Sequence, residues 1–484
     1  MQELKNKKLF KQACYINNQW VQAGSEKFIT VVNPYDNSII GQVPDCDSLE
    51  AKAAITAAHH AFEPWKNLTA AQRSDFLINW ADLITENKED LARIMTIEQG
   101  KPLAESLGEI EYANSFLIWF AQEGRRVYGD VIPSNKINQH LIVIKQPVGV
   151  VAAITPWNFP AAMITRKVAP ALAAGCTVVV KPDHNTPFSA FALGVLAEQA
   201  GFPPGVLNIL TGSAELIGME MTSNPHVSKV TFTGSTTVGR LLMKQCAPTL
   251  KKITLELGGN APFIVFEDAD IDAAVKGAIA SKFRNTGQTC VCANRFLIHD
   301  KIFDEFTEKF IKSVQDLKVG DGLTPGVQQG PLISQQAVEK VKTHISDALS
   351  KGATVLLGGK PHALGGLFFE PTVLSNMNKF MLIAKEETFG PVAPLFRFKS
   401  DQEALDLAND TEFGLASYCY TKNIDRIWYM SENLAYGMVG INTGIMSTEV
   451  APFGGVKQSG MGREGSKYGI EPYLEIKYLC IQTN

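Results

Sequence analysis

An alternation of short apolar runs with helical stretches between residues 148 and 256 constrains the fold of this chain most strongly. The runs are rich in β-branched residues, which favour strands. They are VGVVAAI at 148–154, TVVVK at 177–181, VLNIL at 206–210, KVTF at 229–232 and KITLE at 252–256. Two of the segments between them, 187–200 and 237–247, have the apolar spacing of helices. Strands that alternate with helices form right-handed βαβ units, so a parallel sheet covered on both faces is predicted, an architecture that binds nucleotides.

A second alternating set follows the first. Its predicted elements are strands at 262–266 and 295–299, a helix over 270–283 and a long amphipathic helix from Asp304 to Leu317. The alternation continues to about residue 440, which predicts a second α/β domain with its own sheet. Because 484 residues exceed what one compact core usually holds, two domains are expected. Upstream, residues 69–118 are predicted to be helical, with a helix stop at Gly100.

The expected fold class is therefore α/β, with a Rossmann-type cofactor domain and a second α/β catalytic domain. Two alternating segments near residues 127–147 and 465–484 fit neither domain. Strands left over in this way often build a subunit contact, so we expect a small β segment for oligomerisation. The expected boundaries are 1–126 with 148–255 for the dinucleotide-binding domain, 256–446 for the catalytic domain, and 127–147 with 465–484 for the oligomerisation segments.

Charge and hydropathy exclude several classes of protein. The 45 basic and 49 acidic residues leave a net charge of −4, and no Lys/Arg run suggests binding to nucleic acid or to an anionic membrane. The N-terminal residues lack the apolar core of a signal peptide. The most apolar tract, Val148 to Thr165, is interrupted by Pro156, Asn158 and Pro160 and reads as a strand and a loop. We expect a cytoplasmic protein without nucleic-acid or membrane partners.

The segment NTGQTCVC at 285–292 places Cys290 and Cys292 one residue apart. The eight cysteines are scattered and do not form the framework of a disulfide-rich secreted protein. Without a CxxC pair or a nearby pair of histidines, no metal site is expected. Cys290 is a candidate nucleophile, provided that its surroundings lower the thiol pKa; the alternative is a buried small apolar side chain.

Three further motifs lie where the cleft of an open α/β sheet is expected. The turn FTGSTTVG, with Gly234 and Gly239, joins a strand to a helix, and such a helix start attracts phosphate. Glu256 ends a strand at the edge where these sheets bind ligands, and Asn158 follows another strand and could donate to a developing negative charge. The alternatives are a plain turn, a solvated carboxylate and a turn asparagine.

Taken together, these motifs are similar to a known family. TPWNFP, FTGSTTVG, LELGGNAP, NTGQTC, EETFGPV and APFGGVKQSGMGREGS resemble, in order and along the whole chain, the signatures of the aldehyde dehydrogenase superfamily, and the regions around Asn158 and Cys290 most resemble its succinate-semialdehyde dehydrogenases. The resemblance implies that Cys290 attacks the aldehyde to form a thiohemiacetal and then a thioester. It assigns the oxyanion hole to the Asn158 amide with the Cys290 N–H, and the base that activates the deacylating water to Glu256.

The resemblance also implies how the cofactor is bound. It assigns cofactor contacts to Trp157, Lys181, Gly234, Ser235, Leu257 and Glu387. NAD-preferring relatives often carry a glutamate three residues after the lysine, where it repels a 2′-phosphate. This chain has His184 at that position. We therefore expect NADP as the preferred cofactor, with NAD possible.

Arginines beside the reactive motifs indicate an acidic aldehyde. The guanidinium group matches a carboxylate, and Arg166 and Arg284 lie close in sequence to Asn158 and Cys290. The resemblance assigns both arginines, with Ser447, to the carboxylate of succinate semialdehyde; surface salt bridges are the alternative. One methylene changes binding by only about 1–3 kcal/mol, so glutarate semialdehyde or a broader aliphatic aldehyde stays open.

Three expectations complete the sequence-based view. A non-catalytic binding or structural protein on the same fold is the alternative of another class. A homotetramer or a homodimer is expected. Cys292 is either a redox partner for Cys290, as in similar semialdehyde dehydrogenases with a C-x-C, or a packed apolar side chain.

Overall fold

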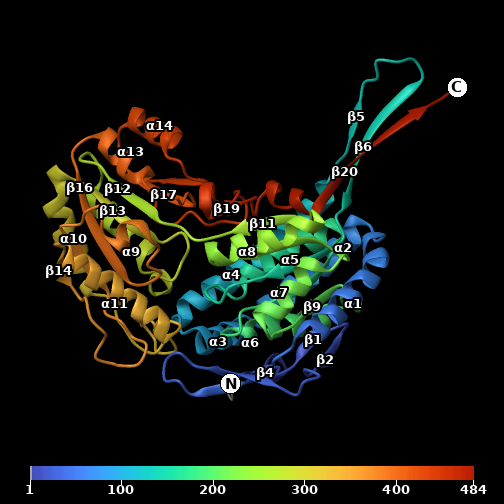
Figure 1. The fold of residues 1–484 in the computed structure, drawn as a ribbon, viewed down its shortest axis with the longest axis horizontal. Helices are drawn as coiled ribbons and strands as arrows, with labels where there is room; N and C mark the ends of the chain where they lie inside the picture. The colour runs from blue at the N-terminus through green and yellow to red at the C-terminus, as the bar shows by residue number, and fades with distance from the viewer. Residues whose placement is uncertain (1–2) are drawn as a thin grey trace.

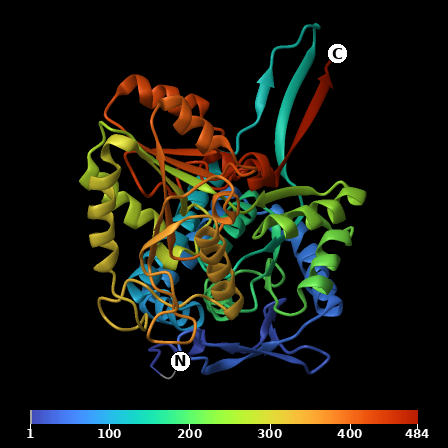
Figure 2. The same ribbon diagram turned by 60° about the vertical axis from the view of Figure 1, so that its left-hand side comes forward.

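The computed structural model describes residues 3–484 and arranges them as two lobes and a projecting arm (Figure 1). One lobe holds an eight-stranded sheet built mainly from the N-terminal half, and the other holds a seven-stranded sheet. The arm carries the C-terminus at its end and projects from the body in both views (Figures 1 and 2). The α/β fold predicted from the alternating pattern is confirmed.

The eight-stranded sheet has a parallel centre. Its strand order is β19-β11-β10-β7-β8-β9-β1-β2. The parallel strands are β7 (Val150–Ile154), β8 (Thr177–Lys181), β9 (Leu207–Ile209), β10 (Val227–Thr233) and β11 (Lys252–Glu256). The antiparallel edges are β19 (Gly460–Met461), β1 (Cys14–Ile16) and β2 (Gln19–Val21). Because β8 lies on one side of β7 and β10 on the other, the strand order reverses at β7, where open sheets bind ligands.

Helices cover this sheet and account for the predicted helical stretch at 69–118. They are α1 (Ser48–Lys66), α2 (Ala70–Glu86), α3 (Lys88–Gln99), α4 (Leu103–Glu123), α5 (Ala162–Ala174), α6 (Pro187–Gln199), α7 (Ala214–Ser223) and α8 (Thr236–Cys246). Gly100 ends α3 in the left-handed conformation, with φ of 90°, so the predicted stop is confirmed. Every residue of α5 is buried, so this helix belongs to the core.

The second sheet is also mostly parallel, in the order β14-β15-β16-β13-β12-β17-β18. Its strands are β12 (Ala261–Val265), β13 (Ala293–His299), β14 (Thr354–Leu357), β15 (Thr372–Ser375), β16 (Val392–Phe398), β17 (Ala416–Tyr420) and β18 (Met438–Ile441). Only β14 runs antiparallel to its neighbour. The helices of this lobe are α9 (Ile271–Lys282), α10 (Phe303–Gln315), α11 (Gln335–Ser350), α12 (Leu382–Lys385), α13 (Asp401–Asn409) and α14 (Ile424–Asn433).

The arm is a three-stranded antiparallel sheet of β5 (Asp130–Ile132), β6 (Gln139–Pro147) and β20 (Leu474–Gln482). It joins two segments far apart in sequence and exposes large apolar side chains, among them Val131, 83% exposed, Ile476 and Tyr478. A separate hairpin of β3 (Phe28–Val32) and β4 (Ile39–Pro44) lies near the N-terminus. Across residues 3–484 no helix combines the length and the apolar character needed to cross a bilayer.

Candidate active site

The candidate residues of the first sheet meet at the carboxyl ends of its strands. Asn158 follows β7, Gly234 follows β10, and Glu256 is the last residue of β11. The register of the parallel pairs aligns these ends, since Thr233 lies opposite Glu256. The sheet order, which the alternating pattern does not specify, therefore brings the separate motifs to one edge.

The loop after β10 has the construction of a phosphate-binding turn. The Gly234 N–H donates to the Glu256 carbonyl at 3.0 Å, and the Ser235 hydroxyl caps the start of α8. A Cβ on Gly239 would lie 2.5 Å from the end of the Leu257 side chain, so a larger residue there would require that side chain to move. The N-terminus of α8 is thus held against the strand ends with N–H groups available for a phosphate, and these residues fit a dinucleotide.

Two side chains lie at the carboxyl end of β8: Lys181 is the last residue of this strand, and His184 lies in the loop that follows. Lys181 is buried, and burial lowers the pKa of its ammonium group. His184 has a 56% exposed side chain, with Nδ1 3.7 Å from a carboxylate oxygen of Asp183. This end of β8 therefore presents one buried cation, one exposed histidine and one carboxylate. These are the groups that would face either the ribose hydroxyls of NAD or the 2′-phosphate of NADP.

The EETFGPV loop of the second lobe contacts this edge of the first sheet. Glu387 accepts from the Gly259 N–H at 3.1 Å, and burial raises the pKa of its carboxyl to about 7. Phe389, in the left-handed conformation, packs edge-on against Trp157 with the ring centroids 5.6 Å apart. The loop thereby joins the segment after Glu256 to the segment before Asn158.

The loop that leads to Cys290 is tightly coiled. Asn285, Thr286 and Gly287 have φ values of 50°, 56° and 76°, all left-handed. A Cβ on Gly287 would lie 2.2 Å from the Gly390 carbonyl, so the loop requires glycine there. This coil is η4 (Arg284–Gly287), and it precedes Cys290 by three residues. The Asn158 amide donates to the Gln288 carbonyl at 3.1 Å, which joins the two segments expected to form the oxyanion hole.

The expectation that the surroundings lower the pKa of Cys290 is wrong. Burial, with a smaller contribution from the nearby Glu387 and Glu256 carboxylates, raises the pKa of this thiol to about 12. Arg166 and Arg284 act in the opposite direction, but their effect is smaller than that of burial. The thiol is therefore protonated at neutral pH, and its proton must leave when the sulfur attacks.

Glu256 is buried rather than on the surface. Its side chain is 2% exposed, and among residues 3–484 neither carboxylate oxygen has a hydrogen-bond partner. Burial raises the pKa of this carboxyl well above its usual range, and the neighbouring Glu464 adds to the rise. An unpaired buried carboxylate with a raised pKa is typical of a general acid or base.

Both arginines of the expected carboxylate clamp lie near Cys290, since each lowers the pKa of its thiol. Arg166 is buried on α5, with its guanidinium 4.1 Å from the Phe453 ring centroid and its Nε 2.7 Å from Glu464. Its Nη2 has no hydrogen-bond partner within residues 3–484. Arg284 lies over the Phe159 ring, and Ser447 is partly buried in the loop after β18. Because Arg166 is buried, the alternative of a surface salt bridge is wrong for this residue.

Comparisons with known proteins agree with this geometry. The model of the aldehyde dehydrogenase family matches residues 20–479. The chain belongs to the aldehyde dehydrogenase family. It is 60% identical to glutarate-semialdehyde dehydrogenase of Pseudomonas aeruginosa and 59% identical to the succinate-semialdehyde dehydrogenase GabD of Escherichia coli strain K12, whose name specifies NADP(+); each match covers 99% of both proteins. A crystal structure titled as an E. coli NADP-dependent enzyme superposes with a TM-score of 0.99, at 59% identity, over 99% of this chain and 100% of that one.

Sequence reasoning missed one buried group beside the candidate base of this aldehyde dehydrogenase. Glu464 is buried, accepts from Lys167 and pairs with Arg166, so it links the candidate base to the candidate clamp. The signal was present, because Glu464 lies in the GREGS segment of a motif that carried the family resemblance. A glutamate beside glycines reads as a surface residue until the fold shows its burial.

Cys292 of this aldehyde dehydrogenase lies in a buried environment that favours packing. Its thiol donates to the Lys282 carbonyl at 3.1 Å, and burial raises its pKa. The hydrogen bond directs the sulfur to the end of α9. A redox partnership with Cys290 stays a prediction.

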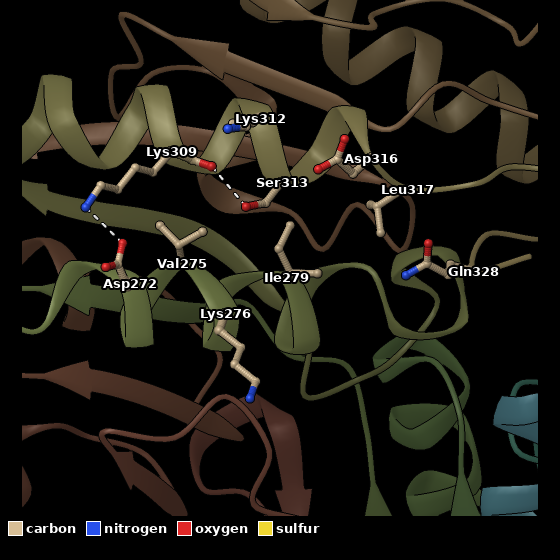
Figure 3. A pocket seen from close by; sticks show the side chains of 10 residues that line it. All are labelled: Asp272, Val275, Lys276, Ile279, Lys309, Lys312, Ser313, Asp316, Leu317 and Gln328. Carbon is tan, nitrogen blue, oxygen red and sulfur yellow. Dashed lines mark hydrogen bonds and ion pairs between the residues drawn. The ribbon is translucent and has the colours of Figure 1, made fainter. Parts of the chain in front are cut away.

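An open groove in the second lobe is separate from this aldehyde dehydrogenase site. It lies between α9 and α10 and has a volume of about 560 Å³ (Figure 3). Lys309 on its rim is paired with Asp272 at 2.8 Å, and Ile279 and Leu317 form part of its apolar floor. The groove contains none of the motif residues, so we assign no catalytic role to it.

Proposed function

We propose that this aldehyde dehydrogenase oxidises succinate semialdehyde to succinate and prefers NADP over NAD. The observation that carries the proposal is the position of Arg166 and Arg284 beside Cys290, with a free Nη2 on Arg166. A substrate with an aldehyde at one end and a carboxylate at the other fits a nucleophile flanked by two guanidinium groups. The name of the E. coli relative supports the same substrate and cofactor.

The residues divide the reaction between them. The Cys290 thiol releases its proton to water as its sulfur attacks the aldehyde carbon, and the oxyanion of the resulting thiohemiacetal is stabilised by the Asn158 amide and the Cys290 N–H. A bound nicotinamide cofactor would supply the hydride acceptor for this carbon, and loss of the hydride would leave a thioester on Cys290. Glu256 then removes a proton from the water that attacks the thioester, which releases the carboxylate product and the thiol.

The proposed function is tested by following absorbance at 340 nm after NADP or NAD is mixed with each aldehyde. Succinate semialdehyde, glutarate semialdehyde and butanal separate the alternatives, because they differ in chain length and in the terminal carboxylate. A higher kcat/KM for glutarate semialdehyde would favour the alternative suggested by the name of the P. aeruginosa relative. No reduction with any aldehyde would favour a non-catalytic protein on the same fold.

We expect Arg166→Ala or Arg284→Ala to lower kcat/KM for succinate semialdehyde about ten- to a hundredfold, and for butanal much less. A charge-assisted hydrogen bond is worth roughly 1.5–3 kcal/mol. Butanal has no carboxylate, so it makes no such bond with either arginine and loses nothing when the arginine is removed. Steady-state kinetics on both aldehydes measure the difference. Equal losses on the two substrates would mean that the arginines support the structure of the site and do not bind the substrate carboxylate. For Arg166, the ion pair with Glu464 would then be the structural contact that is lost.

We expect His184→Glu to shift the ratio of kcat/KM values from NADP towards NAD about tenfold or more. A carboxylate at this exposed position would repel the 2′-phosphate and accept from the ribose hydroxyls. Kinetics with both cofactors at fixed aldehyde measure the ratio, and His184→Gln is the matched control without charge. An unchanged ratio in His184→Glu would mean that this side chain does not face the adenosine ribose.

We further propose that the protein is a cytoplasmic homotetramer or homodimer, and the apolar arm supports the association. Val131 and Ile476 are largely exposed on a small sheet that projects from the body, and exposed apolar side chains of this kind mark association surfaces. Measurement of the molar mass by light scattering tests the oligomeric state.

A further inference from the structure

The junction of α3 and α4 buries an unusual number of polar side chains. Glu98, Gln99 and Lys101 are at most 1% exposed, and Glu109 on the first turns of α4 is also buried. Burying a charge is costly unless the group is paired and hydrogen-bonded. The contacts of these side chains show what the cluster holds in place.

Lys101 holds the segment that carries Asn158. Its ammonium donates to Glu109 at 2.5 Å and to the backbone carbonyl of Asn158 at 2.6 Å. The same ammonium lies 3.9 Å from the ring centroid of Phe159, the next residue. A residue distant in sequence thus fixes both the backbone and the following side chain at the position of a proposed oxyanion donor.

Glu109 holds the other end of the same segment. One carboxylate oxygen accepts from the N–H groups of Ala161 and Ala162, at 3.0 and 3.2 Å, at the start of α5. No side chain within α5 caps this end, so Glu109 satisfies the first N–H groups in its place. The Lys101–Glu109 pair therefore spans the segment from Asn158 to the helix that carries Arg166.

The same junction holds the loop that leads to Cys290. The Asn285 N–H donates to Glu105 at 2.8 Å, and its side-chain oxygen accepts from Gln99 at 2.9 Å. The Asn285 amide in turn donates to the Asn158 carbonyl at 3.0 Å. The Asn158 carbonyl therefore accepts from both Lys101 and Asn285. Through these two hydrogen bonds, the segment of Asn158 and the loop of Cys290, which form the proposed oxyanion hole, are both held by the α3–α4 junction.

We propose that Lys101 is a positioning residue that, with Glu109 and Gln99, sets the distance between the Asn158 amide and the Cys290 N–H. It does not touch the substrate; it acts through the backbone of Asn158. A displacement of about 1 Å in such a site costs on the order of a hundredfold in rate, so the effect falls on hydride transfer rather than on substrate binding. The proposal rests on the oxyanion role proposed above for Asn158.

The test uses Lys101→Met combined with Glu109→Gln, which removes both charges of the pair, so that neither partner is left buried without the other. We expect a melting temperature near that of the wild type, a rate of hydride transfer lowered about ten- to a hundredfold, and KM values changed by less than about threefold. Glu98→Gln is the matched control: Glu98 is equally buried at this junction but accepts only from Phe188 and Ser189 at the start of α6. It should transfer hydride at the wild-type rate.

If the double variant does not fold, Gln99→Met provides the second test. It removes the hydrogen bonds to the Lys101 N–H and to Asn285 without changing any charge, and should slow hydride transfer about fivefold or more. A wild-type rate of hydride transfer in the folded double variant, or in Gln99→Met where the double variant does not fold, would overturn the positioning role.

A mutant cycle separates this inference from the proposed function. If Lys101 acts through Asn158, the junction substitutions should slow Asn158→Ala by much less than they slow the wild type. Equal slowing in both backgrounds would overturn the positioning role alone. A wild-type rate of hydride transfer in Asn158→Ala would overturn the oxyanion role, and the positioning role with it.

Discussion

Cys290→Ala is expected to lower kcat/KM at least about 10⁴-fold, because the variant has no sulfur to form the thiohemiacetal and the thioester. Steady-state reduction of NADP with succinate semialdehyde measures the loss. Binding of NADPH, followed by fluorescence titration, should stay close to that of the wild type, since the turn at Gly234 and the N-terminus of α8 are unaffected.

Cys292→Ala is the matched control for this loss. It removes the same atom two residues away, and the Cys292 thiol is hydrogen-bonded to Lys282 outside the proposed reaction path. Activity in Cys292→Ala should stay within about threefold of the wild type. An inactive Cys292→Ala beside an active Cys290→Ala would reverse the assignment of the nucleophile.

The raised pKa of Cys290 also predicts how fast this thiol reacts with an alkylating reagent at different pH values. A thiol whose pKa is about 12 is protonated at pH 7, so its thiolate fraction rises about tenfold for each pH unit below that value. Alkylation of Cys290 by iodoacetamide should therefore accelerate steadily between pH 6 and pH 9. A plateau below pH 8 would show that the thiol has a lowered pKa.

The local pattern of the sequence predicts the strands and helices well, since burial on both faces imposes β-branched runs such as Thr177–Lys181. The order of the strands is a different matter. That β10 pairs with β7, and that the short strand Gly460–Met461 closes the edge beside β11, depends on contacts between distant segments. No local periodicity records such contacts.

The residues of the candidate site also fall into those that the local sequence predicts and those that only the fold reveals. Cys290, Glu256 and Asn158 are found from sequence because each lies in a motif at the end of a predicted strand or loop. Lys101 and Glu464 are missed because charged residues normally lie at the surface, and only the fold reveals their burial. The pKa of Cys290 is predicted with the wrong sign for a related reason: the balance between burial and two nearby arginines is a property of the assembled cleft.

Glu256→Gln should leave the first half of the reaction intact and nearly stop the second. Glutamine has almost the same shape but cannot accept a proton from water, so the thioester forms and then persists. In rapid mixing we expect a burst of about one reduced cofactor per active site, followed by turnover about 10²- to 10⁴-fold slower than in the wild type. Full steady-state activity would contradict the assignment of the base.

The pH dependence of turnover gives the sharper test of Glu256. Burial raises the pKa of this carboxyl, so its ionised form, which is the base, becomes populated only as the pH rises through that raised value. Where deacylation limits turnover, kcat should therefore increase with pH in the wild type, and the increase due to this carboxyl should be absent in Glu256→Gln. Hydroxylamine, which attacks a thioester without needing a base, should restore turnover in Glu256→Gln but not in Cys290→Ala. If hydroxylamine leaves Glu256→Gln slow, the burst does not end in a thioester, and the block lies before deacylation.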